Sequence, residues 1–71
     1  MKLREYAIKH SDKISDDAKC LVIDEIGTVV DFRYVRSAVE KFAQSDVITA
    51  FSQTDLAGND HIIFIYVKEL V

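Results

Sequence analysis

The residues best suited to chemistry in this sequence surround His61. Asp60 precedes it directly and Asp55 lies a few positions earlier, and a histidine paired with an aspartate can act as a general base. The candidate nucleophiles are Ser52 and Thr54, whose hydroxyls are also explained by the ordinary polarity of a strand. Because no catalytic motif joins these residues, a small enzyme is the least favoured hypothesis, and we expect no catalytic residues.

Metal and cofactor sites are not expected either. Cys20 is the only cysteine, and with His10 and His61 it makes no ligand cluster at the spacing of a zinc site. An acidic stretch lacks the alternating oxygen ligands, central glycine and closing glutamate of a calcium loop. Its members are Asp16, Asp17, Asp24, Glu25 and Asp31. We therefore predict a buried apolar role for Cys20, a packing role for His10 and a solvated face for the acidic residues.

The charge distribution argues against nucleic acid as the principal partner. The net charge is −3, and since residues 1–44 hold eight basic and eight acidic side chains, the whole excess lies in residues 45–71. Proteins that bind nucleic acid neutralise its phosphates with a basic face. The alternative hypothesis is a nucleic-acid-binding regulator that uses one exposed helix face. Its residues are Arg33, Arg36 and Lys41, with Tyr34 among them.

Size and composition favour association with another chain. A chain of 71 residues allows one domain, and at this length folding buries only about 60% of the surface that the unfolded chain exposes. Small folds compensate with disulfides, a metal or association. The single cysteine excludes an internal disulfide and 49% of the residues are hydrophobic, so we expect a homodimer.

Location follows from two further features. No apolar run reaches the ~18 residues of a membrane-spanning helix. The N-terminal segment is too charged for the apolar core of a secretory signal. We therefore expect a cytoplasmic protein that does not enter a membrane.

The elements that must position these residues begin with an ambiguous segment. Residues 2–14 combine good helix formers with apolar residues at helical spacing, which predicts a helix; the alternative is a strand over 2–9. Residues 19–25 predict a strand because their centre is apolar and partly β-branched. Gly27 can supply the positive φ of a tight turn, after which residues 28–30 return as a second strand.

A second helix and a closing hairpin follow. Residues 32–44 place their apolar side chains on one continuous arc, and Asp31 suits the N-cap because its carboxylate can accept the free amides of the first turn. Strands over 47–54 and 61–68 should pair across a turn at 55–60. The residues of this turn that tolerate a left-handed backbone are Gly58 and Asn59.

The predicted fold is a single α+β domain over residues 1–71. A mainly antiparallel four-stranded sheet is packed by the helix at 32–44 and by an N-terminal helix, in the order αββαββ; an N-terminal strand would change the order to βββαββ. The predicted core consists of Leu3, Leu21, Ile23, Val29, Phe32, Val35, Val39, Phe42, Ile48, Phe51, Ile63, Ile65 and Val67.

The last strand is apolar on both of its faces. Side chains alternate along a strand, so one set faces one way and the next set the other: Ile63, Ile65 and Val67 against Ile62, Phe64 and Tyr66. If both helices pack on one face, a second copy or another protein must cover the other, whereas helices on opposite faces would leave nothing exposed. The candidate interface residues are Ile62, Phe64, Tyr66, Ile63 and Tyr34.

Tyr34 has two interpretations. On the helical wheel it lies on the polar side, where an exposed tyrosine suits a binding anchor. A partly buried place at the edge of the helix–sheet contact would explain it as well.

These observations predict a non-enzymatic interaction protein. It would bind and modulate another protein, with inhibition as one form of modulation, and would do so as a homodimer. Many accessory proteins of bacteria and phages are of this size, although an analogy of size has low specificity.

Overall fold

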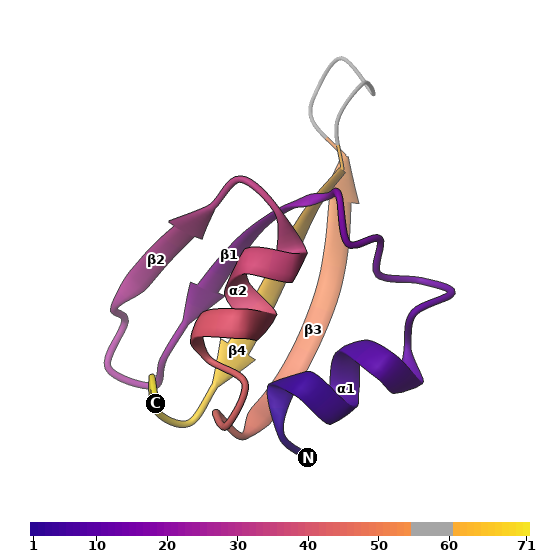
Figure 1. The fold of residues 1–71 in the computed structure, drawn as a ribbon. Coiled ribbons are helices and arrows are strands. Elements are labelled where there is room, and N and C mark those ends of the chain that lie inside the picture. Colours follow the sequence, from indigo (N-terminus) through magenta and orange to yellow (C-terminus); the bar gives the residue numbers. More distant parts are fainter. Residues whose placement is uncertain (55–60) are drawn as a thin grey trace.

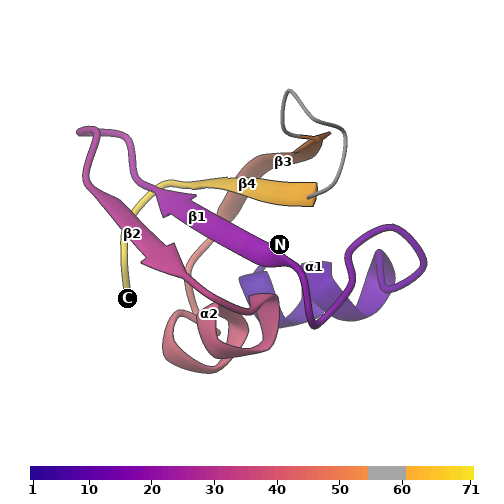
Figure 2. The same cartoon turned by 90° about the horizontal axis from the view of Figure 1, so that it is seen from above.

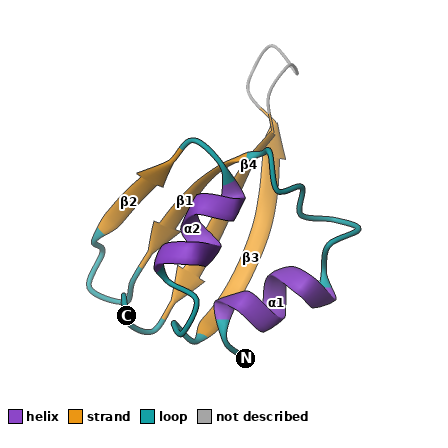
Figure 3. Cartoon of the chain, viewed as in Figure 1, coloured by secondary structure: helices purple, strands orange, loops and turns teal. Residues whose placement is uncertain are grey.

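The computed structural model describes residues 1–54 and 61–71, where two helices and four strands follow in the order αββαββ (Figures 1 and 3). The elements are α1 (Leu3–Lys9), β1 (Lys19–Ile23), β2 (Val29–Phe32), α2 (Val35–Lys41), β3 (Val47–Thr54) and β4 (His61–Val67). The α+β prediction is confirmed, and the alternative with an N-terminal strand is wrong. Within the described residues, neither helix has the length and apolar character needed to cross a membrane.

The four strands form one mixed sheet in the order β2-β1-β4-β3. Each outer strand runs antiparallel to its neighbour in sequence, β2 to β1 and β3 to β4. The two inner strands, β1 and β4, run parallel, so the sheet is mostly antiparallel, as predicted. Parallel neighbours need a crossover connection. Here the connection from β1 to β4 consists, along the chain, of the edge strand β2, the helix α2 and the other edge strand β3 (Figure 2).

Both helices lie on the same face of the sheet (Figure 2). The core forms between them and the inward side chains of the two central strands, which are apolar and lose their contact with water there. The buried apolar side chains are Leu3, Ile14, Cys20, Val22, Val35, Ala38, Phe42, Ile63, Ile65 and Val67.

α1 is shorter than the predicted helix over 2–14, since it ends after seven residues. Its start is tied to the segment before β3: the Leu3 amide donates to the Ser45 carbonyl at 2.8 Å. Lys2 and Asp46 form an isolated antiparallel bridge, and their side chains make a salt bridge of 3.3 Å. The N-terminal residues therefore cover the beginning of the β3 edge.

α2 begins at Val35, and the prediction that Asp31 caps a helix starting at residue 32 is wrong. Asp31 and Phe32 belong to β2. Phe32 still packs on the core from the strand, because its ring meets that of Phe42 edge to face with centroids 5.7 Å apart. Phe32 therefore fits the apolar periodicity of the helix because it packs on the same core, although it belongs to the neighbouring strand.

The first turn of α2 has no side-chain cap. Its free amides are satisfied instead by the loop before β1: the Val35 amide donates to the Ala18 carbonyl at 2.8 Å, and the Arg36 amide to the Asp16 carbonyl at 3.2 Å. Because backbone carbonyls replace the capping carboxylate, the helix can begin after Tyr34, an extended residue with no capping oxygen in reach.

The turn between β1 and β2 confirms the role of Gly27, whose φ is +90°. The Asp24 carboxylate accepts hydrogen bonds from the amides of Ile26 at 3.1 Å and Thr28 at 2.8 Å, which closes the turn. The turn predicted at 55–60, with Gly58 and Asn59, lies outside the described residues.

Five residues of the predicted core are not part of it. In β1 the buried set is Cys20 and Val22, the alternate of the predicted one. The strand is apolar on both faces, so its sequence does not distinguish the inward side. In β3 a register shift lies between Val47 and Thr49. The corrected residues are Leu21, Ile23, Val29, Ile48 and Phe51.

Candidate interaction face

The face of the sheet opposite the helices has no covering element in the described part of the chain (Figure 2). Its apolar side chains come from all four strands, and we call this set the open face. The open face consists of Leu21 and Ile23 of β1, Val29 of β2, Phe51 of β3 and Ile62, Phe64 and Tyr66 of β4. Each of them is at least partly exposed.

The strand register brings these side chains side by side. Leu21 and Phe51 flank Phe64 from its two sides, and Ile23 lies beside Tyr66. Paired residues share a face of the sheet, so the apolar side chains form a continuous patch across the two central strands. Its outer members are the most exposed: Val29 retains 54% of its surface and Phe51 48%.

Three aromatic rings form the centre of the open face. Phe51 stacks on Phe64 with ring centroids 5.2 Å apart and an angle of 15° between the planes. Phe51 also stacks on Tyr66, at 5.9 Å and 21°. Stacked aromatic side chains present a large and rigid apolar area, and ordering them on contact costs little entropy.

The structure divides the predicted interface residues of β4 between the two faces. Ile62, Phe64 and Tyr66 belong to the open face and are half-buried. The inclusion of Ile63 is wrong, because it is 3% exposed and lies beside Cys20 beneath the helices. Alternation along the strand requires that Ile63 and Phe64 point to opposite sides.

Tyr34 lies immediately before α2 and is half-buried, which agrees better with the interpretation as a partly buried residue than with that as a fully exposed one. Two of the predicted cations gather on its ring: the guanidinium carbon of Arg36 lies 4.2 Å from the centroid and that of Arg33 lies 5.7 Å away. Arg36 also forms a salt bridge with Asp17, which offsets its charge. Lys41 lies in the last turn of α2, so the predicted basic patch is divided.

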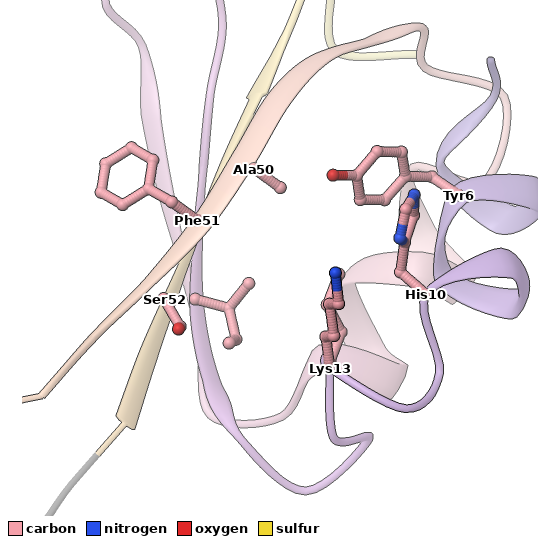
Figure 4. Close-up of a pocket in the computed structure, with 8 residues that line it drawn as sticks. Tyr6, His10, Lys13, Ala50, Phe51 and Ser52 are labelled. Carbon is pink, nitrogen blue, oxygen red and sulfur yellow. The ribbon is translucent and has the colours of Figure 1, made fainter.

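A small cavity lies between α1 and β3 (Figure 4). It is lined from one side by Tyr6, His10 and Lys13, and from the other by β3 residues that include Ala50 and Ser52. The imidazole of His10 lies against the Tyr6 ring, with centroids 4.3 Å apart and an angle of 40° between the planes, a contact in keeping with the predicted packing role. At about 190 Å³, the cavity is smaller than the ~300 Å³ at which ligand pockets begin.

The predicted catalytic constellation is only partly described. His61 is exposed at the start of β4 and lies opposite Thr54, while Ser52 lies opposite Ile63. Asp55 and Asp60 fall outside the described residues.

Cys20 has the buried apolar environment that the sequence predicts. Its side chain is fully buried and unpaired within the described residues. Burial, with a smaller contribution from the Asp31 carboxylate, raises the pKa of its thiol to about 12. At neutral pH the thiol is therefore protonated and unreactive.

The sequence did not identify four members of the open face as surface residues: Leu21, Ile23, Val29 and Phe51. The pairing of β1 with β4 sets the face on which Leu21 and Ile23 lie, and the pairing of β2 with β1 then sets that of Val29. The β1–β4 pair joins distant parts of the chain, so no local pattern reveals it. In residues 1–54 and 61–71, no group of three His, Cys, Asp or Glu side chains is placed to hold a metal ion.

Comparisons with protein-family models, curated proteins and solved structures give no match to this chain, so its function has to be inferred from the open face.

Proposed function

We propose that this chain is a non-enzymatic interaction protein that binds and modulates another protein through its open face. The observation that carries the proposal is the continuous apolar patch on the uncovered side of the sheet, centred on the stacked rings of Phe51, Phe64 and Tyr66. Contiguous exposed apolar patches on small proteins are typical of interaction sites.

The pattern of the sheet supports this role. An antiparallel sheet with one face in water normally alternates apolar residues inward with polar residues outward. Here β4 is apolar on both sides, as is the centre of β1. Leu21 and Phe64 are apolar, so their contact with water is unfavourable, whereas polar residues at these positions would be well solvated. A docked partner would remove this apolar surface from water.

The composition of the patch fits a partner surface of matching apolar character. Interface centres are enriched in aromatic residues and depleted of charge, and the open face combines three aromatic with four aliphatic side chains. Charged neighbours lie at its margin: Lys19 beside Ile62 and Asp31 beside Leu21. A rim with both signs of charge would orient a partner without dominating its affinity.

Affinity capture from the native host tests the proposal when wild type is compared with two single variants. Phe64→Glu places a charge at the centre of the open face and should abolish capture of the specific partner. Ile26→Glu is the matched control, because Ile26 is 88% exposed in the β1–β2 turn and belongs to no strand. Circular dichroism checks that both variants fold. Retention of the same partner by folded Phe64→Glu would contradict the proposal.

A nucleic-acid-binding regulator is the second candidate, and the gathering of Arg33 and Arg36 on the Tyr34 ring favours it. Its charge is limited by the salt bridge to Asp17. This function predicts a gel shift with mixed DNA or RNA that weakens steeply as salt is added. Arg33→Ala should reduce such a shift, and the absence of a shift by wild-type protein at low salt would exclude it.

A further inference from the structure

Within the described residues, the outer edge of β3 is the longer of the two edges of the sheet. At its beginning the Val47 amide donates to the Met1 carbonyl at 2.9 Å, and Lys2 bridges to Asp46. Over residues 49–54, β3 pairs only with β4 among the described elements. The outward amides and carbonyls of this stretch are therefore free to pair with another strand.

Edge strands of soluble proteins are normally protected by charges, prolines, bulges or short length. β2, the opposite edge, has only four residues and includes Asp31. β3 has eight residues, and none of them is charged or a proline. Its register shift lies near its beginning, between Val47 and Thr49, so it leaves the stretch over 49–54 regular.

We infer that β3 pairs antiparallel with β3 of a second copy, joining the two sheets into one of eight strands about a two-fold axis. This gives the expected homodimer a defined surface. It extends the proposed function without depending on it, because the edge rather than the open face makes the contact. An uncharged strand suits pairing with its own copy, since like charges opposite one another across strands are destabilising.

The register of the pair follows from backbone alternation. In an antiparallel sheet, the amide and carbonyl of every second residue point to the same neighbouring strand. When a strand pairs with its own copy, odd-numbered residues therefore lie opposite odd-numbered residues, and even-numbered opposite even-numbered. The pairing centred on Phe51 uses the regular stretch and avoids the segment that Lys2 and Met1 occupy. It places Phe51 opposite Phe51 of the second copy, and Thr49 opposite Gln53.

This arrangement also joins the two open faces. A two-fold axis perpendicular to the sheet keeps both on the same side, so the stack of Phe51 on Phe64 continues across the axis into the second copy. The dimer would present one wide apolar surface, with helices on the opposite side of the eight-stranded sheet.

Two double variants test the register, with sedimentation equilibrium at about 50 mM salt as the measurement. Thr49→Lys with Gln53→Lys sets like charges opposite each other twice in the dimer, whereas Thr49→Lys with Gln53→Glu sets opposite charges there. Both positions are exposed, so both variants should fold. The dimer dissociation constant of the Lys/Lys variant should be at least about tenfold higher than that of the Lys/Glu variant.

Overall charge cannot produce that result. The Lys/Lys variant brings the net charge of −3 closer to zero, which lowers the repulsion between copies, so a weaker dimer must reflect the local contact. Equal dissociation constants would overturn the edge pairing, as would a wild-type protein that stays an 8.1 kDa monomer at micromolar concentration. A monomer that still captures a partner through Phe64 leaves the proposed function intact, so the two failures are distinguishable.

Discussion

The two faces of β4 have similar apolar side chains and differ mainly in what covers them. Along β4, Ile63, Ile65 and Val67 are buried beneath the helices, while the alternate residues on the open face are half-buried. Both sets are apolar. Composition therefore does not decide which side becomes the core; the placement of the helices does.

Dimensions explain why only one face is covered. Four strands spaced about 4.8 Å apart span about 14 Å between the outermost two, and a helix with its side chains is about 10 Å wide. Two helices side by side therefore cover one face, and the described chain holds only α1 and α2, of seven residues each. The other face is left with its apolar residues in contact with solvent.

The largest difference in stability between the faces should appear when one isoleucine on each face is truncated to alanine. Ile65 is fully buried, so Ile65→Ala should lower the free energy of unfolding by about 3 kcal/mol through lost burial and the cavity left behind. Ile62→Ala, on the open face of the same strand, should cost about 1 kcal/mol. Urea denaturation measures both. Equal losses would mean that the open face is as well packed as the core.

Most of the architecture could be predicted from the sequence because it depends on local pattern. Helical spacing predicts α1, and β-branched or apolar runs predict the strands. The faces of β1 could not be predicted, because Leu21 and Val22 are equally suited to a core. The choice between them depends on the parallel pairing with β4, which joins segments that are far apart in the sequence.

The start of α2 shows the same limit on a smaller scale. Asp31 is a good capping residue, but the amides it would cap are bonded to the Ala18 and Asp16 carbonyls. That contact comes from tertiary structure, so no pattern around residue 31 reveals it. The candidate site was half predictable for a similar reason: alternation separates Ile63 from Phe64, but only the position of the helices tells which of them is exposed.

An isosteric exchange on each face should give the next largest contrast. Val22→Thr places a hydroxyl in the fully buried core and should cost about 2 kcal/mol, because the hydroxyl loses its hydrogen bonds to water. Val29→Thr makes the same change on the exposed margin of the open face and should alter stability by less than about 0.5 kcal/mol. Thermal and urea unfolding compare the two. A large loss for Val29→Thr would show that this margin is buried.

The thiol of Cys20 tests the covered face by titration. Since its pKa is raised from 9.0 to about 12, the folded protein holds this proton more tightly than the unfolded chain. The associated stability is fully present below pH 9 and is lost as the pH rises toward 12, by about 1.4 kcal/mol at pH 10. Wild type should therefore lose more stability between pH 8 and pH 10 than Cys20→Ala, which lacks the thiol.

The open face offers a matched control for that thiol. Leu21→Cys in the Cys20→Ala background moves the thiol by one residue to the opposite face of β1. It should react with a thiol reagent at pH 8 in the folded protein, whereas native Cys20 should react only at the rate of unfolding. Parallel pH profiles for wild type and Cys20→Ala, or rapid reaction of native Cys20, would contradict the burial of this side chain.

The smallest effect concerns the stack at the centre of the open face. Phe51→Ala removes the ring that contacts both Phe64 and Tyr66, and because Phe51 is 48% exposed, the loss should be about 1 kcal/mol, mainly the stacking itself. Phe51→Ala should also lower the binding of an apolar fluorescent dye. Ile26→Ala, outside the sheet, should change neither the stability nor the dye binding. Unfolding at several protein concentrations separates the intrinsic loss from self-association, since only the latter depends on concentration. Unchanged dye binding by Phe51→Ala would show that the aromatic stack is not the apolar surface that solvent reaches.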